Sequence, residues 1–106
     1  MPMHNHLVNA AIQFVPLSTT QHPYEWVDEA IAVIAHSGLR YEVGAFATTV
    51  EGTYAQVMQL FNSINEHFCT RGCTEWVINL QLGMRCDRDC TIFEKTAKHQ
   101  QTAAAA

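Results

Sequence analysis

The sequence predicts a small α+β fold in which two helices cover one face of an antiparallel four-stranded sheet. Three observations predict it. Apolar residues alternate with polar ones near both ends of the chain, as they do in half-buried strands. Two segments between these ends repeat apolar residues at helical spacing, and two short segments rich in β-prone residues separate the helices. The order strand, helix, strand, strand, helix, strand is that of the ferredoxin-like βαββαβ sandwich.

The first half of the domain supplies one strand and one helix. Leu7–Leu17 is predicted as the strand, and Pro16 with the polar residues after it ends the pairing. Pro23 suits the first turn of a helix, which apolar spacing extends to about Ser37. Gly38 can adopt the positive φ that ends a helix. The buried face of the strand is expected to carry Val8, Ala10, Ile12 and Phe14, and that of the helix Val27, Ala30, Ile31 and Ile34.

A hairpin and a second helix follow. Arg40–Phe46 and Thr48–Glu51 are predicted as two short strands, joined by a turn near residues 45–47. Helical spacing then runs from about Tyr54 to Thr70, and Gly72 ends this helix.

The last part of the chain supplies the fourth strand. Alternation over Glu75–Met84 places Trp76, Ile78, Leu80 and Leu82 on one face and Val77, Asn79 and Gln81 on the other. Thr91 with Glu94 three residues later matches a capping box, so a short C-terminal helix is expected.

Length and composition bound the class of protein. A chain of 106 residues suits one domain, expected at residues 7–98 between a loose N-terminus (1–6) and a loose C-terminal tail (99–106). Ten acidic against six basic residues give a net charge of -4, which argues against a nucleic-acid partner. No segment is apolar enough for a membrane span and no export signal is seen, so a cytoplasmic protein with reduced thiols is expected.

Several segments together resemble a known family, the small thiamine-binding proteins of the YkoF-like group. The most specific match is Ala47-Thr48-Thr49-Val50-Glu51-Gly52, which is similar to the family's Thr-x-aliphatic-Glu-Gly segment. Weaker matches are 15–17, 37–41 and 93–95, and the resemblance spans residues 8–98. It implies non-catalytic binding of thiamine or its hydroxymethylpyrimidine part by a cytosolic homo-oligomer, a dimer or tetramer paired through its sheet faces. No cofactor is implied. The chain departs from the family in its extra cysteines and at Ser18, where many relatives have Gly.

Four residues are the candidate ligand contacts. Gln13 and Asn79 lie on the sheet face away from the helices, where amides offer both donors and acceptors to an aminopyrimidine. The alternative is that these amides are only solvated or line a polar interface. Glu51 could balance a thiazolium cation, or it could be an acid beside a helix N-terminus. Thr48 could contribute a hydroxyl, or it could be an ordinary strand residue.

Other chemistry-bearing residues are interpreted structurally. The four cysteines form two pairs with the spacing of a zinc site, Cys69 with Cys73 and Cys86 with Cys90. A continuous fourth strand between the two pairs would hold them roughly 30 Å apart, too far for one site. A two-cysteine site with a histidine, or one between subunits, remains open. His36, His67 and His99 are expected to cap helix ends, and His22 is assigned no role. Trp26, Trp76 and Phe46 could stack on a ligand ring, although Trp76 is placed in the core.

No motif of an enzyme is found. The chain has no glycine-rich phosphate loop, nucleophile elbow or HExxH zinc motif. The sequence therefore predicts a small-molecule binder, with a structural or regulatory oligomer, or a thiol-based metal protein, as the alternatives.

Overall fold

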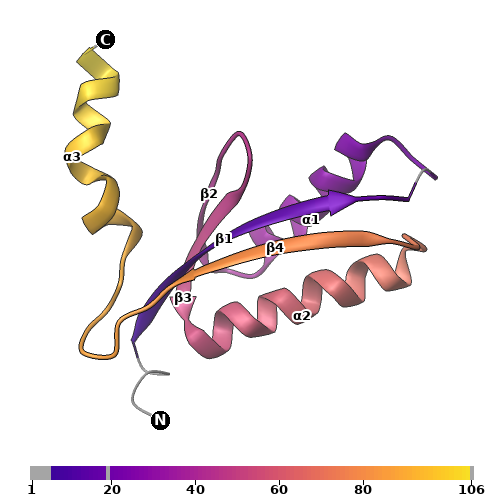
Figure 1. The fold of residues 1–106 in the computed structure, drawn as a ribbon, viewed down its shortest axis with the longest axis horizontal. Helices are drawn as coiled ribbons and strands as arrows, with labels where there is room; N and C mark the ends of the chain where they lie inside the picture. The colour runs from indigo at the N-terminus through magenta and orange to yellow at the C-terminus, as the bar shows by residue number, and fades with distance from the viewer. Residues whose placement is uncertain (1–5, 19, 106) are drawn as a thin grey trace.

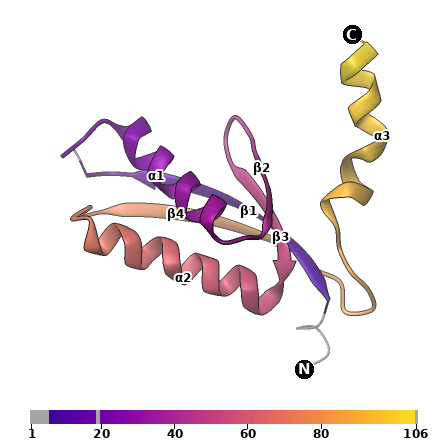
Figure 2. The same cartoon turned by 180° about the vertical axis from the view of Figure 1, so that it is seen from behind.

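The predicted α+β ferredoxin-like sandwich is confirmed by a computed structural model that describes residues 6–18 and 20–105. Within these residues the sheet has the order β2-β3-β1-β4, with every pair antiparallel. Helices α1 and α2 lie behind the sheet in Figure 1 and in front of it in the reverse view of Figure 2, so both cover the same face. The elements are β1 (Leu7–Pro16), α1 (Pro23–His36), β2 (Arg40–Val43), β3 (Thr48–Thr53), α2 (Tyr54–Thr70), β4 (Trp76–Gly83) and α3 (Ile92–Ala105).

Strand β1 is central in the sheet, and its two neighbours, β3 and β4, pair with it over different lengths. It pairs with β4 from Asn9 to Pro16. It pairs with β3 only from Leu7 to Ile12, where Ile12 lies opposite Thr48. The last four residues of β1 therefore have a strand neighbour on one side only.

The core lies between the sheet and the two helices, and the predicted alternation of β1 places its apolar residues there. The rings of Phe14 and Phe68 stack with their centroids 4.1 Å apart. Trp76 packs beside them, as expected, and its Nε1 donates to Asn65 Oδ1 at 2.9 Å. The predicted helix faces supply Ala30, Ile34, Val57, Leu60, Ile64 and Phe68 to the same core.

The helix ends follow local rules. Gly38 and Gly72 have φ of 79° and 81°, as expected of residues that end helices. Thr53 and Gln56 form a capping box at the start of α2, and Thr91 and Glu94 form the predicted one before α3, with N–H to oxygen distances of 3.0 and 3.2 Å. A residue without a predicted role, His22, is the N-cap of α1, because its Nδ1 accepts from Tyr24 N–H at 3.1 Å.

Two segments differ from the sequence expectation. Strand β2 ends at Val43 rather than Phe46, because Gly44 N–H donates to Ala47 O at 2.9 Å and closes a tight turn. Helix α3 is longer than the short helix expected, and its backbone stays helical to Ala105, through residues interpreted as a loose tail. It stands away from the sheet in both views (Figures 1 and 2). Hydrogen bonds from Ile92 and Lys95 in its first turn join it to β3 and β1.

Candidate functional site

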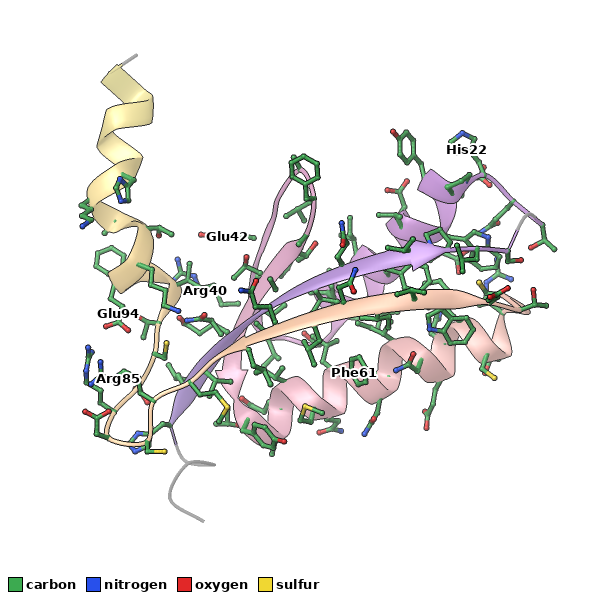
Figure 3. All side chains as sticks on the ribbon, viewed as in Figure 1. His22, Arg40, Glu42, Phe61, Arg85 and Glu94 are labelled. Carbon is green, nitrogen blue, oxygen red and sulfur yellow. The ribbon has the colours of Figure 1, made fainter. Side chains whose placement is uncertain are left out.

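A pocket of about 340 Å³ lies on the sheet face opposite the helices, at two of the predicted contact residues. This open face is turned toward the viewer in Figures 1 and 3. The register of β1 and β4 builds the floor, because Gln13 lies opposite Asn79 and Ala11 opposite Gln81. Residues of the turn between β2 and β3 complete the lining, which consists of Ala11, Gln13, Phe46, Ala47, Ile78, Asn79, Leu80 and Gln81. Polar amides and one aromatic ring therefore meet in this open-face pocket.

The two amides are paired with each other. Asn79 Nδ2 donates to Gln13 Oε1 at 2.9 Å. The pair leaves an amide NH₂ on Gln13 and a carbonyl oxygen on Asn79 without a hydrogen-bond partner among the described residues. The pair therefore offers one donor and one acceptor, the two kinds of group that read the edge of a heterocycle. Phe46, whose side chain is 85% exposed, lies in the adjoining turn.

A second, smaller pocket adjoins the first around this turn. The notch, as we call it, has a volume of about 260 Å³ and lies between α1, the end of β1 and residues 44–48. It shares Gln13, Phe46 and Ala47 with the open-face pocket. Thr48 lines the notch and faces the helices, because its pair residue Ile12 is in the core. Thr48 is therefore on the opposite side of the sheet from Gln13 and Asn79.

Glu51 lines neither the open-face pocket nor the notch. Its pair residue on β1 is Asn9, four residues before Gln13 and so roughly 13 Å along the strand. Glu51 Oε1 accepts from Ile92 N–H at 2.6 Å, at the start of α3. The helix-terminal interpretation of this acid therefore applies, but at α3 rather than α2, where Thr53 is the cap.

Asn9 and Lys95 complete the attachment of α3. Lys95 Nζ donates to Asn9 Oδ1 at 3.1 Å, and Asn9 Nδ2 donates to Cys90 O at 3.0 Å. Gly83 leaves room for this contact, since a Cβ there would come within 2.9 Å of both Asn9 Oδ1 and Lys95 Nζ. Figure 3 shows Glu94 in the first turn of α3 and Arg85 in the loop that leads to it. Asn9 has the same strand parity as Gln13, yet it is a buried link between β1 and the C-terminal segment.

The helical side of the molecule has a groove of about 870 Å³ between α1 and α2, which none of the four predicted residues lines. At its edge Glu29 accepts from Arg71 Nε at 2.9 Å and from Gln21 at 2.7 Å, and its Oε1 lies 2.8 Å from His67 Nε2. The Arg71 hydrogen bond is the main reason that the pKa of Glu29 falls from 4.5 to about 2, with Gln21 and His67 contributing in the same direction. His67 lies in the last turn of α2, as expected, and its ring contacts an acid of the other helix.

The cysteines do not converge. All four are free thiols; Cys73 and Cys90 are buried, whereas Cys69 and Cys86 are exposed. In the part of the chain that the structure describes, no group of three or more His, Cys, Asp or Glu residues is placed to hold a metal ion. In the same part, no helix is both long and apolar enough to cross a bilayer.

Comparison with known proteins identifies the family. The family model described as "Thiamine-binding protein" matches residues 10–100. The chain belongs to this family. A UPF0045 protein of Clostridium perfringens is 31% identical over 92 residues, which are 87% of this chain and 96% of the relative. The family resemblance expected from the sequence is confirmed.

Solved structures of similar chains share the fold. A domain of unknown function, DUF77, from Bacillus cereus superposes with a TM-score of 0.85 at 31% identity and covers 92% of this chain and 93% of its own. A Thermotoga maritima protein, proposed to act in thiamine biosynthesis or salvage, has a TM-score of 0.81 at 29% identity, with 89% and 99% covered.

The structure brings together only part of the predicted site. Gln13 and Asn79 are in contact, Thr48 is in the adjoining notch, and Glu51 is at the base of α3. Strand parity predicted that Gln81 lies on the same sheet face as Asn79. That Gln81 also lines the pocket could be seen only from the register between β1 and β4. The turn that brings Phe46 beside Gln13 had no strong sequence signal.

Proposed function

We propose that this protein binds thiamine, or its hydroxymethylpyrimidine part, in the open-face pocket and does not transform it. The observation that carries this is the Gln13–Asn79 pair, whose free donor and acceptor match an amino group beside a ring nitrogen. The chain belongs to a family described as thiamine-binding, and this membership supports the choice of ligand.

The lining of the open-face pocket favours binding over catalysis. It consists of amide, aliphatic and aromatic side chains, with no acid, base or nucleophile among them. Exposed Phe46 offers a ring face on which a pyrimidine or a thiazolium cation can stack. Such a site orients and holds a flat cation but supplies no group that titrates near neutral pH.

The other two candidate residues would act from separate positions. Thr48 would contact the ligand only from the notch. Glu51 is already hydrogen-bonded to α3, so we assign it an indirect contribution through the position of that helix.

A second copy of the chain would cover the open face. Val77 and Met84 expose 46% and 37% of their surface, and Val77 belongs to that face. Pairing of sheets would bury Val77 and place the open-face pocket at the interface. The cytoplasmic location expected from the sequence stays a prediction.

Titration calorimetry with thiamine, hydroxymethylpyrimidine and thiamine phosphate tests the site. Replacing Gln13→Ala or Asn79→Ala should weaken binding about fivefold or more, since each removes a hydrogen bond worth about 1 kcal/mol. Gln59→Ala and Asn62→Ala, on exposed positions of α2, are the matched controls and should bind as the unmodified protein does.

Two results would count against the proposal. Equal affinities for the site variants and their controls would remove the open-face pocket as the site. No heat with any of the three ligands, in folded protein, would leave the structural oligomer as the better hypothesis.

A further inference from the structure

Helix α3 leaves the body of the protein from the open face of the sheet. Asn9 and Glu51 lie opposite each other on β1 and β3, and Asn9 has the strand parity of Gln13, so both side chains belong to the open face. Glu51 accepts from Ile92 N–H at 2.6 Å. Asn9 accepts from Lys95 Nζ at 3.1 Å. These two bonds fix the first turn of α3 on the open face.

Beyond its first turn, α3 lies apart from the other helices and strands of the described chain (Figures 1 and 2). Phe93 exposes 60% of its surface, and Lys98 and His99 are exposed as well. A helix of 14 residues is only marginally stable in water without tertiary contacts. That α3 stays helical to Ala105 therefore favours a partner that packs against it.

A second copy of the chain is the partner that this geometry favours. Stacked sheets lie about 10 Å apart and a helix is about 10 Å across, so a second sheet on the open face would lie level with the first turn of α3. The edge of that sheet would then meet the helix. Charge supports the same choice, because α3 has two lysines against one glutamate in a chain whose net charge is -4. A positive helix is attracted to the acidic body of another copy.

We propose that α3 is an association arm: its exposed side, which includes Phe93, packs against a second copy whose open face covers this one, and the second copy's α3 does the same in return. Such mutual contacts are those of a two-fold interface. The part of α3 beyond its first turn is then folded only in the associated protein. This inference rests on the sheet pairing within the proposed function and goes beyond it, because it names the element that stabilises the pair.

Hydrogen exchange of the unmodified protein, measured from micromolar to near-millimolar concentration, tests the association arm. Light scattering gives the mass at each concentration. The backbone amides of residues 96–99 should exchange about tenfold more slowly where the mass is that of two or more copies than where it is that of one.

Two variants test the arm from opposite ends of the open face. Phe93→Glu places an acid in the first turn, where it favours an isolated helix, yet it should lower the mass and speed α3 exchange about tenfold because the contact with the second copy is lost. Val77 lies six residues before Gly83, the pair residue of Asn9, and so about 20 Å from the attachment of α3. Val77→Glu should nevertheless speed α3 exchange to the same extent, because it separates the copies. The matched control, Gln59→Glu on an exposed position of α2, should change neither the mass nor the exchange.

The outcomes separate the arm from the sheet pairing and from ligand binding. Unchanged α3 exchange in both variants, with a lower mass in Val77→Glu, would overturn the arm and leave the sheet pairing in place. An oligomer in which α3 exchanges as fast as an unfolded segment would also overturn the arm. A monomer at every concentration would overturn both the arm and the sheet pairing, while calorimetry with thiamine would still decide the proposed ligand binding.

Discussion

At the scale of single residues, Glu29 shows how one carboxylate joins segments that are distant in sequence. It lies on α1 and is hydrogen-bonded to Arg71 after α2 and to Gln21 before α1. Its side chain is 23% exposed, so these bonds are only partly screened by water. The low pKa of Glu29, about 2, reflects the preference of the folded state for the charged form.

This preference predicts a pH dependence of stability. The folded-state pKa is below the ordinary value of 4.5, so the stabilisation is complete above about pH 4.5 and is lost as the pH falls toward 2. At pH 6, Glu29→Gln should lower the free energy of unfolding by about 1–2 kcal/mol, and the difference should shrink toward pH 2. Urea unfolding at pH 6 and pH 3 measures it, with Glu66→Gln as the control. An equal loss at both pH values would contradict the charged network.

The candidate residues show what the sequence can and cannot predict at this scale. Strand parity placed Gln13 and Asn79 on the open face, because alternation is a local property. It could not show that they touch, because contact depends on the register of strands 66 residues apart in the chain. Thr48 and Glu51 are close in sequence, yet odd separation in a strand puts their side chains on opposite faces.

At the scale of elements, α3 is held through its first turn. Glu51 accepts from Ile92 N–H, where a negative charge is favourable at a helix N-terminus. Lys95 reaches back to Asn9 on β1. The capping box of α3 was predicted because Thr91 and Glu94 are neighbours in sequence, whereas the anchoring by Glu51 spans 41 residues and left no local signal.

Glu51→Ala should therefore loosen α3 more than it weakens ligand binding. Amide exchange at Ile92 and in the following turn should speed up, because that N–H loses its charged acceptor. The control is Glu42→Ala on β2, whose carboxylate contacts only exposed Arg40 among the hydrogen bonds described. A large loss of thiamine affinity with unchanged exchange in α3 would instead make Glu51 a direct contact.

The strands and the two covering helices were predictable for a related reason. Their apolar residues repeat with the period of a strand or of a helix, and this period can be read from the residues of one element without its neighbours. Gly38 and Gly72 likewise mark the helix ends through their own backbone conformation. The end of β2 was less predictable, because the tight turn from Gly44 to Ala47 contains none of the usual turn pairs.

At the scale of the whole molecule, the two faces of the sheet differ in what covers them. Helices α1 and α2 bury one face (Figure 2), and the other stays open beside the projecting α3 (Figure 1). An open face that carries both amides and an exposed valine is suited to pairing with a second copy.

Val77→Glu tests this pairing. If two sheets meet face to face, a charge at this position would be buried and unpaired, and the oligomer should dissociate at micromolar concentration. Light scattering coupled to chromatography measures the mass. Val43→Glu, at an exposed valine of β2 on the other side of the sheet, is the control and should keep the mass of the unmodified protein. A monomer in the unmodified protein would contradict the assembly itself.

The most direct test of ligand binding is a thermal-shift titration of the unmodified protein with thiamine and with hydroxymethylpyrimidine. A ligand that binds only the folded state raises the midpoint of unfolding in a saturable way. We predict such a rise with both compounds. A midpoint that stays constant through millimolar concentrations of both would contradict the account.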